Sequence, residues 1–278
     1  MAMHVGREMR RALRELRYEP VSRRIRCAKD GVPVLDTTDA YLVWEPRRVV
    51  PIYAVPEADF RVGLTPYDEA EPVVPDALPP VIGSDRFGLH VTPGQRLSLV
   101  VGGTTLEDAA FRPSDPDLGG RITVDWAPFD WTEEDQPVIG HPHDPFGRID
   151  VLRSGRHVVV SLDGVVLADT RRARVLYETS LPPRWYIPRD DVRLDLLEPS
   201  DTRTVCAYKG YASYYAYPVA GDDGRSVAWT YVDPLHDAAE VKSMICFYSE
   251  RSDLDIDGER LARPRTPWSR HHDSADGT

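Results

Sequence analysis

Lysine is scarce in this 278-residue chain, where it supplies only three of the 34 basic residues, at Lys29, Lys209 and Lys242. Apolar runs are short, and none reaches the ~18 residues that a membrane-spanning helix needs. The N-terminus also lacks the apolar core of a signal peptide. These absences predict a cytoplasmic protein without a membrane partner.

Cysteine is equally sparse. Cys27, Cys206 and Cys246 are odd in number and widely spaced, and no Cys-x-x-Cys pair occurs. This pattern excludes a disulfide framework and a four-thiolate zinc site. We therefore expect a reduced protein with no structural metal and no cofactor.

The net charge of -11 excludes another class of partner. An acidic surface is repelled by nucleic-acid phosphates and by anionic lipid headgroups. We expect no nucleic acid among the partners, and the sequence indicates no particular oligomeric state.

Two stretches of the chain resemble each other at an offset of 133 residues. Seven of the 22 positions are identical between residues 24–45 and 157–178, including Asp30-Gly31 and Asp163-Gly164. Asp-Gly between two alternating runs is typical of a β-hairpin with a type I′ turn, which needs positive φ at both positions. Each copy continues into an extended run that ends in an aromatic residue and a glutamate, Glu45 or Glu178.

Later segments extend this correspondence. We align Tyr53 with Tyr186, residues 90–94 (HVTPG) with 206–210 (CAYKG), Trp126 and Asp130 with Trp229 and Asp233, and Asp150 with Asp253. The alignment predicts a first repeat domain at residues 18–152, with a Pro- and acid-rich insertion at 57–80, and a second repeat domain at 153–262. Apolar periodicity over residues 7–17 predicts an N-terminal helix within residues 1–17. Asp233-Pro234 predicts a short helix with Asp233 as its N-cap. The polar residues 263–278 predict a disordered tail.

Several motifs resemble a known bacterial family. The runs DGVVLADT, YIPRDDV, CAYKGYASYY and AWTYVDP, with HPHDPF and RIDVLRSGRHV, are similar to domain of unknown function 427, sometimes labelled nucleotidyltransferase-like. The resemblance covers nearly the whole chain as two tandem copies. It implies a mainly β fold of two β-tent domains, similar to Mss4. Nucleotidyl transfer uses a glycine pair followed about ten residues later by an Asp-x-Asp metal site. Gly119-Gly120 is followed only by Asp125, so that motif is incomplete.

Two short motifs contain possible metal ligands. His141, His143 and Asp144 lie among prolines, and the alternative for them is a rigid connector between the copies. The run from Asp253 to Gly258 mimics the start of a calcium loop, but Pro264 stands where that loop needs a glutamate. We interpret the run as a strand with Leu254 and Ile256 inward, and we predict no metal site.

The run from Cys206 to Gly210 is the strongest candidate for chemistry. A cysteine near a lysine can act as a nucleophile when its thiolate is stabilised. The alternative is a buried, inert cysteine beside a turn at Lys209-Gly210.

Aromatic residues cluster in the same half, since nine of the 13 tyrosines lie between Tyr177 and Tyr248. Tyrosine and tryptophan suit a ligand pocket and a half-buried sheet equally well. Our first hypothesis is a binding module for a small polar or aromatic molecule in the second repeat. The second is an enzyme, a transferase or hydrolase, using Cys206 or Lys209, and the third is a structural or interaction protein. The expected site residues are Glu178, Tyr186, Cys206, Tyr208, Lys209, Tyr214 and Trp229.

Overall fold

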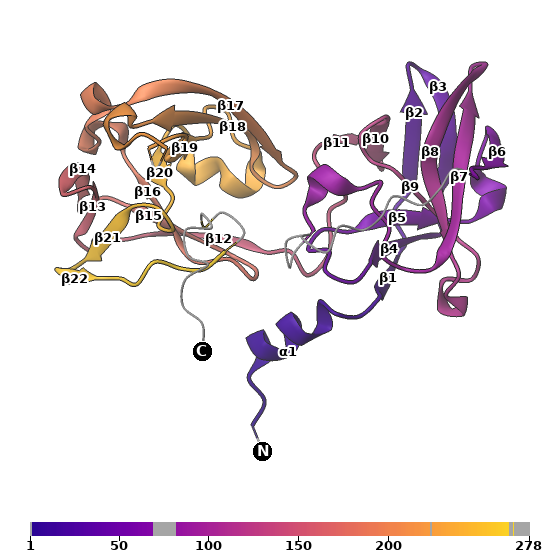
Figure 1. The fold of residues 1–278 in the computed structure, drawn as a ribbon, viewed down its shortest axis with the longest axis horizontal. Helices are drawn as coiled ribbons and strands as arrows, with labels where there is room; N and C mark the ends of the chain where they lie inside the picture. Colours follow the sequence, from indigo (N-terminus) through magenta and orange to yellow (C-terminus); the bar gives the residue numbers. More distant parts are fainter. Residues whose placement is uncertain (1, 69–81, 223, 267–268, 270–278) are drawn as a thin grey trace. The chain divides into compact units, whose positions relative to one another are not determined.

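The computed structural model describes residues 2–68, 82–222, 224–266 and 269. The chain divides into two compact units, Met1–Asp144 and Pro145–Thr278. Antiparallel sheet dominates both units, which confirms a mainly β protein (Figure 1). Over the residues described, we find no helix with the length and apolar character required to cross a bilayer.

The first unit starts with one α-helix and continues in strands joined by short 3₁₀ turns. Its elements are α1 (Val5–Ala12), β1 (Arg17–Val21), β2 (Ile25–Lys29), β3 (Val32–Thr37), β4 (Ala40–Trp44), β5 (Ile52–Val55), η1 (Glu57–Asp59), β6 (Gly63–Pro66), η2 (Ser84–Arg86), β7 (Gly94–Val101), β8 (Thr104–Pro113), η3 (Pro116–Leu118), β9 (Ile122–Val124), β10 (Asp130–Glu133) and β11 (Gln136–Val138).

The second unit has strands and 3₁₀ turns in its described residues. Its elements are β12 (Ile149–Arg153), β13 (Val158–Leu162), β14 (Val165–Thr170), β15 (Arg174–Glu178), β16 (Arg184–Ile187), η4 (Arg189–Asp191), η5 (Leu194–Leu196), β17 (Glu198–Cys206), β18 (Gly210–Ala216), η6 (Pro218–Ala220), β19 (Ala228–Thr230), η7 (His236–Val241), β20 (Ile245–Phe247), β21 (Asp253–Ile256) and β22 (Glu259–Arg260).

The two units have the same strand order. In the described residues of the first unit, a seven-stranded sheet runs β1-β4-β5-β9-β8-β7-β6 and a four-stranded sheet runs β11-β10-β2-β3. In the second unit the orders are β12-β15-β16-β20-β19-β18-β17 and β14-β13-β21-β22. Each strand of the first unit therefore has a counterpart in the same place in the second.

The predicted hairpin turns are present in both units. Asp30 and Gly31 have φ of 49° and 78°, and Asp163 and Gly164 have φ of 51° and 78°. Positive φ at both positions matches the right-handed twist of the flanking strands. The turns join β2 to β3 and β13 to β14, as predicted.

Alternation gives the large sheet of the second unit two different faces. Ile187, Ala228 and Ile245 belong to a core shared with the four-stranded sheet. Their strand neighbours Tyr186, Trp229 and Cys246 point the other way, since successive side chains alternate, and they belong to a separate aromatic cluster. Ala238 and Val241 of η7 pack in that cluster too, so η7 covers the aromatic face.

Three predicted boundaries were wrong. The unit boundary lies at 144/145 rather than 152/153, because β12 pairs with β15 of the second unit. The N-terminal helix ends at Ala12, and Arg17 begins β1 instead of closing the helix. Asp233 does not cap a helix: η7 begins at His236 after Leu235, with no side-chain cap bond.

The insertion and the tail also differ from expectation. The insertion contributes strand β6, which pairs with β7, while its residues 69–81 lie outside the described part. In the tail, Arg263 pairs with Asp253 at 2.8 Å, and Thr266 donates to Glu250 at 2.7 Å. Residues 267, 268 and 270–278 of the predicted disordered tail lie outside the described residues.

Sheet register corrects the later part of the repeat alignment. Tyr186 is opposite Cys246 in the ladder, and the corresponding pair in the first unit is Ala54 with Thr123, so Tyr53 is not the counterpart of Tyr186. By the same register Trp229 corresponds to Phe111, not Trp126. The counterpart of Asp253 is Asp130, because both begin the strand that pairs with the first hairpin strand.

We expect residues 145–278, expressed alone, to unfold in one cooperative transition, because this unit closes two cores of its own. A fragment of residues 153–262 should melt more than about 5 °C lower, since about 1 kcal/mol already shifts the Tm of such a domain by 4–8 °C. The shorter fragment lacks most of β12, which pairs with β15, and it lacks the Thr266 contact to Glu250. Calorimetry of both fragments measures this. Equal melting temperatures, or no cooperative transition in the longer fragment, would contradict the structure.

Candidate functional site

A buried ion pair lies at one end of the aromatic face of the second unit. Lys209 Nζ donates to Glu178 Oε2 at 2.5 Å, and only 10% and 18% of the two side chains are exposed. Glu178 ends β15, and Lys209 lies in the turn that joins β17 to β18. Gly210, with φ of 92°, lets this turn close, and the Lys209 carbonyl accepts from the Leu235 amide at 3.1 Å. The turn is thereby held against the segment that leads into η7.

The surroundings of Lys209 keep it charged. Burial lowers the pKa of a lysine, but here Cys206 and the Glu178 carboxylate outweigh burial, and the pKa of Lys209 is raised. The side chain is therefore an ammonium at neutral pH. An ammonium has no lone pair for nucleophilic attack, so the geometry favours Lys209 as a binding cation rather than as the predicted nucleophile.

The predicted aromatic residues form a packed layer behind this pair. Tyr186, Tyr214 and Trp229 are 1%, 7% and 6% exposed. Trp229 Nε1 donates to the Tyr186 hydroxyl at 3.1 Å, and the Trp229 ring lies 4.5 Å from that of Tyr248. Burial raises the pKa of Tyr186 well above its usual value. These three side chains pack together in the interior of the unit and do not line an open cleft.

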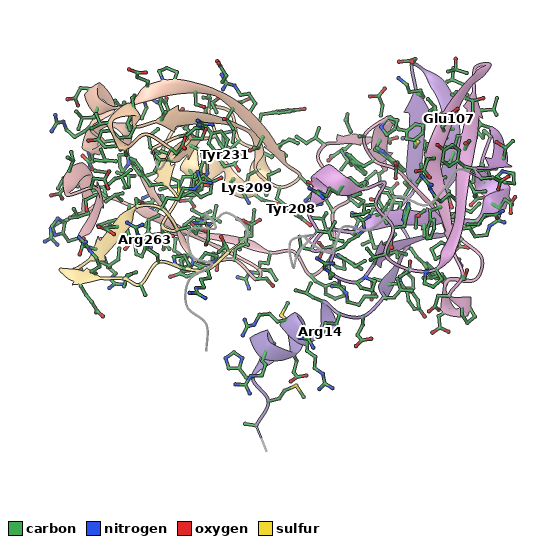
Figure 2. The ribbon with its side chains drawn as sticks, viewed as in Figure 1. Arg14, Glu107, Tyr208, Lys209, Tyr231 and Arg263 are labelled. Atoms are coloured by element: carbon green, nitrogen blue, oxygen red, sulfur yellow. The ribbon has the colours of Figure 1, made fainter. Side chains whose placement is uncertain are left out.

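Of the seven expected site residues, Glu178 is partly exposed and Lys209 is buried beside it. Cys206 and Tyr208 are partly exposed. Tyr208 and Lys209 lie in the same region as Tyr231 in Figure 2, and the charges of Cys206 and Glu178 both contribute to raising the pKa of buried Tyr231. The structure therefore brings together the residues predicted from the CAYKG run and the strand-end glutamate.

A second buried ion pair under the aromatic layer was missed in the sequence analysis. Arg184 donates two hydrogen bonds to Glu250, at 2.7 and 2.6 Å, and lies 5.6 Å from the Trp229 ring centroid. Arg184 and Tyr186 are two residues apart on β16 and so share a face. The sequence signal for this ion pair was the spacing of Arg184 and Tyr186. A charged side chain on the same strand face as a buried aromatic side chain needs a partner of opposite charge.

Two hollows in the described residues lie away from the aromatic layer. A void of about 10 Å³ lies between the two sheets of this unit, lined by Val160, Trp185 and Leu254 among others. It is at the lower limit for a single water. A larger depression of about 610 Å³ lies in the first unit, between the Arg112–Glu57 and Arg121–Asp39 ion pairs.

The first unit also buries a carboxylate at the corresponding strand end. Glu45 follows β4 and is 1% exposed. It accepts from His90 Nδ1 at 2.7 Å, from the Val91 and Thr92 amides at 2.6 and 3.1 Å, and from the Thr92 hydroxyl at 3.0 Å. Burial opposes its ionisation, but the bond to His90 and the other contacts leave the pKa of Glu45 below its usual value.

Arg48 and Asp125 complete this buried group. Arg48 is fully buried, donates from Nη2 to the Phe87 carbonyl at 2.8 Å, and has Nε 3.8 Å from Glu45. Burial raises the pKa of Asp125 to about 6, and the charges of His90 and Arg48 only partly oppose this. The first unit thus holds four interacting charged or titratable side chains at a place where no site was predicted.

The histidines of the connector have structural contacts. The His143 amide donates to Glu133 at 3.2 Å, and His141 Nδ1 lies 2.8 Å from the Pro142 carbonyl. Asp253 and Asp255 pair with Arg260. Across residues 2–68, 82–222, 224–266 and 269, no three potential metal ligands among His, Cys, Asp and Glu come together.

The second unit has a family match. Residues 150–258 match the family model NTP_transf_9, described as a domain of unknown function (DUF427). No curated protein matches the chain. The match spans β12 to the β21–β22 turn and includes all seven of the expected site residues.

We expect Asp125→Asn to stabilise the first unit above pH 6. The folded-state pKa is raised from 3.8 to about 6. The cost of the buried carboxylate therefore develops as pH rises from 4 to 6 and reaches about 3 kcal/mol. Asparagine removes that charge. Melts of the variant and wild type should converge near pH 4 and differ by several degrees at pH 8. The exposed Asp130→Asn is the control. A variant less stable than wild type at pH 8 would show that the carboxylate is needed in its charged form.

Proposed function

We propose that the second unit is a binding module for a small polar or aromatic molecule, held by Glu178, Cys206, Tyr208 and Lys209. One observation carries this proposal: a lysine that is 8% exposed is kept as an ammonium by Glu178 beside partly exposed Cys206 and Tyr208. A buried ion pair contributes little net stability compared with apolar packing. Its position beside accessible groups is therefore better explained by recognition of a ligand.

The geometry also suggests which ligand atoms are recognised. Lys209 has three N–H donors, and Glu178 and Cys206 are partners of the same ammonium group. A carboxylate or phosphate oxygen can share this ammonium through a charge-assisted hydrogen bond. Tyr208 offers an aromatic surface next to it, which suits a planar ligand.

The main alternative is an enzyme with Cys206 as its nucleophile. The interaction of Cys206 with Lys209 favours it, because it places a thiol beside a cation. The filled aromatic layer favours a third reading, a structural or interaction protein. The proposed binding module agrees with both observations. In such a module, Tyr186, Tyr214 and Trp229 form the buried layer beneath the binding residues.

We also propose that the chain is a tandem duplication. In this proposal the first unit is a diverged copy of the second unit and belongs to the same family. The shared strand order, the paired Asp-Gly turns and the strand-end glutamates support this. We further propose that both copies have the β-tent, Mss4-like fold that the resemblance implies, and that the protein is cytoplasmic.

Lys209→Met should abolish binding of anionic probes. We suggest benzoate and inorganic phosphate, titrated by calorimetry into the full chain. Removing the ammonium should weaken binding at least about tenfold, since hydrogen bonds to charged groups contribute about 1.5–3 kcal/mol. The matched control is Lys242→Met, which removes an exposed lysine paired with Asp233 at 3.0 Å. Circular dichroism checks that both variants are folded. Unchanged affinity in Lys209→Met, equal loss in both variants, or a wild-type protein that binds neither probe would count against the proposal.

Alkylation of Cys206 separates the binding module from the enzyme. For a binding module we expect iodoacetamide to modify Cys206 at the rate of an ordinary partly exposed thiol at pH 7. A catalytic nucleophile would react at least tenfold faster and would slow in Lys209→Met. Cys27 and Cys246 are buried, and burial raises the pKa of both thiols. They should stay unmodified while the protein is folded, and peptide mass spectrometry reports all three sites at once.

A further inference from the structure

The buried group of the first unit has the parts of a proton-transfer pair. The His90 ring is fixed on two sides: Nδ1 lies 2.7 Å from Glu45 Oε1, and the ring stacks on Phe111 at 3.9 Å with an interplanar angle of 7°. A carboxylate on one imidazole nitrogen sets the tautomer and directs the other nitrogen. Glu45 thus holds the Nδ1 proton and leaves Nε2 as the acceptor.

His90 Nε2 is available to a ligand. It has no hydrogen-bond partner in the described part of the chain, and it is not among the buried side-chain atoms there that lack one. The nitrogen therefore reaches solvent, although only 8% of the His90 side chain is exposed. A fixed ring with one open nitrogen is the arrangement expected of a general base.

Polar atoms without partners surround the pair. In the described residues, Arg48 Nε and Nη1 and Asp125 Oδ1 are buried and have no hydrogen-bond partner. Buried polar atoms are rarely left unpaired unless they serve a site. Asp125 sits against the loop that carries His90, since a Cβ on Gly88 would lie 2.9 Å from Asp125 Oδ2. Unpaired donors on Arg48 and an unpaired acceptor on Asp125 thus belong to the same buried group as His90.

The charges around His90 are nearly balanced. Glu45 and Arg48 face it from the end of β4, Asp125 from the end of β9, and Asp108 and Arg96 pair with each other on β8 and β7. An imidazolium formed at His90 would be compensated by Glu45, whose Oε1 lies 2.7 Å from Nδ1. Proton transfer to His90 therefore leaves no uncompensated charge on the ring.

We propose that the first unit contains its own site, in which His90 Nε2 takes a proton from a small weak acid, with Glu45 as positioning residue. The ligand class is a molecule with an O–H group that is still protonated near neutral pH, such as an enol or a phosphate monoester monoanion. The ligand O–H bond breaks, the Nε2–H bond forms, and the electron pair stays on the ligand oxygen. The site is independent of the module proposed for the second unit.

Diethyl pyrocarbonate tests this directly, because it acylates the unprotonated, accessible nitrogen of histidine. In the full chain at pH 7, we expect His90 to be modified at least tenfold faster than His141, which is buried, and as fast as His236, whose side chain is fully exposed. Peptide mass spectrometry gives the rate at each histidine. If His90 reacts as slowly as His141, its Nε2 is closed and the proposal is wrong.

Nitrogen-15 NMR of wild-type histidines supplies a readout that needs no variant. Neutral His90 should carry its proton on Nδ1, and a neutral His90 with its proton on Nε2 would overturn the proposal. Glu45→Gln should shift the tautomer balance and slow the acylation of His90, while His236 keeps its rate. A purely structural Glu45 would leave the tautomer unchanged in a folded variant. Because both readouts concern only His90, they are unaffected by the outcome of the Lys209 experiment.

Discussion

A carboxylate buried at the end of a strand must find a cation or several hydrogen-bond donors, and both units are built around that requirement. Glu45 and Glu178 lie at the ends of equivalent strands, β4 and β15. In each unit the segment just before an equivalent strand, β7 or β18, supplies the partner. The first unit uses His90 and two backbone amides, and the second uses Lys209. The two units therefore stabilise equivalent carboxylates with different partner groups.

Local features of the fold could be predicted from the sequence. The Asp-Gly turns need positive φ at two successive positions, which few other dipeptides supply, so both hairpins were predicted correctly. In β18, Ala212 and Tyr214 are buried and Tyr211 is exposed, as alternation along a strand requires. The same reasoning assigned Leu254 and Ile256 to the inner face of β21. These predictions succeed because neighbouring residues alone decide them.

Long-range features could not be predicted in the same way. The alignment placed Tyr53 with Tyr186, one residue from the observed register, and a shift of one residue reverses the face of every side chain. The buried charges were missed for a related reason: Arg48 and Arg184 look like surface residues until the strands around them are paired. The candidate site was predicted as a cleft lined by aromatic residues. Only the pairing of β16, β18, β19 and β20 shows that Tyr186, Tyr214 and Trp229 pack against one another.

The energetic cost of the buried group in the first unit bears on the hypothesis that function lies in the second repeat. A copy that had become a scaffold would be free to replace a buried aspartate whose raised pKa signals a cost of about 3 kcal/mol at neutral pH. It would also be free to replace an arginine with unpaired buried donors, since apolar residues of similar volume often pack with equal or greater stability. The first unit instead keeps Arg48 and Asp125 together around His90. This cost supports the proposal that the two units carry sites of different chemistry, a cation at Lys209 and a proton acceptor at His90.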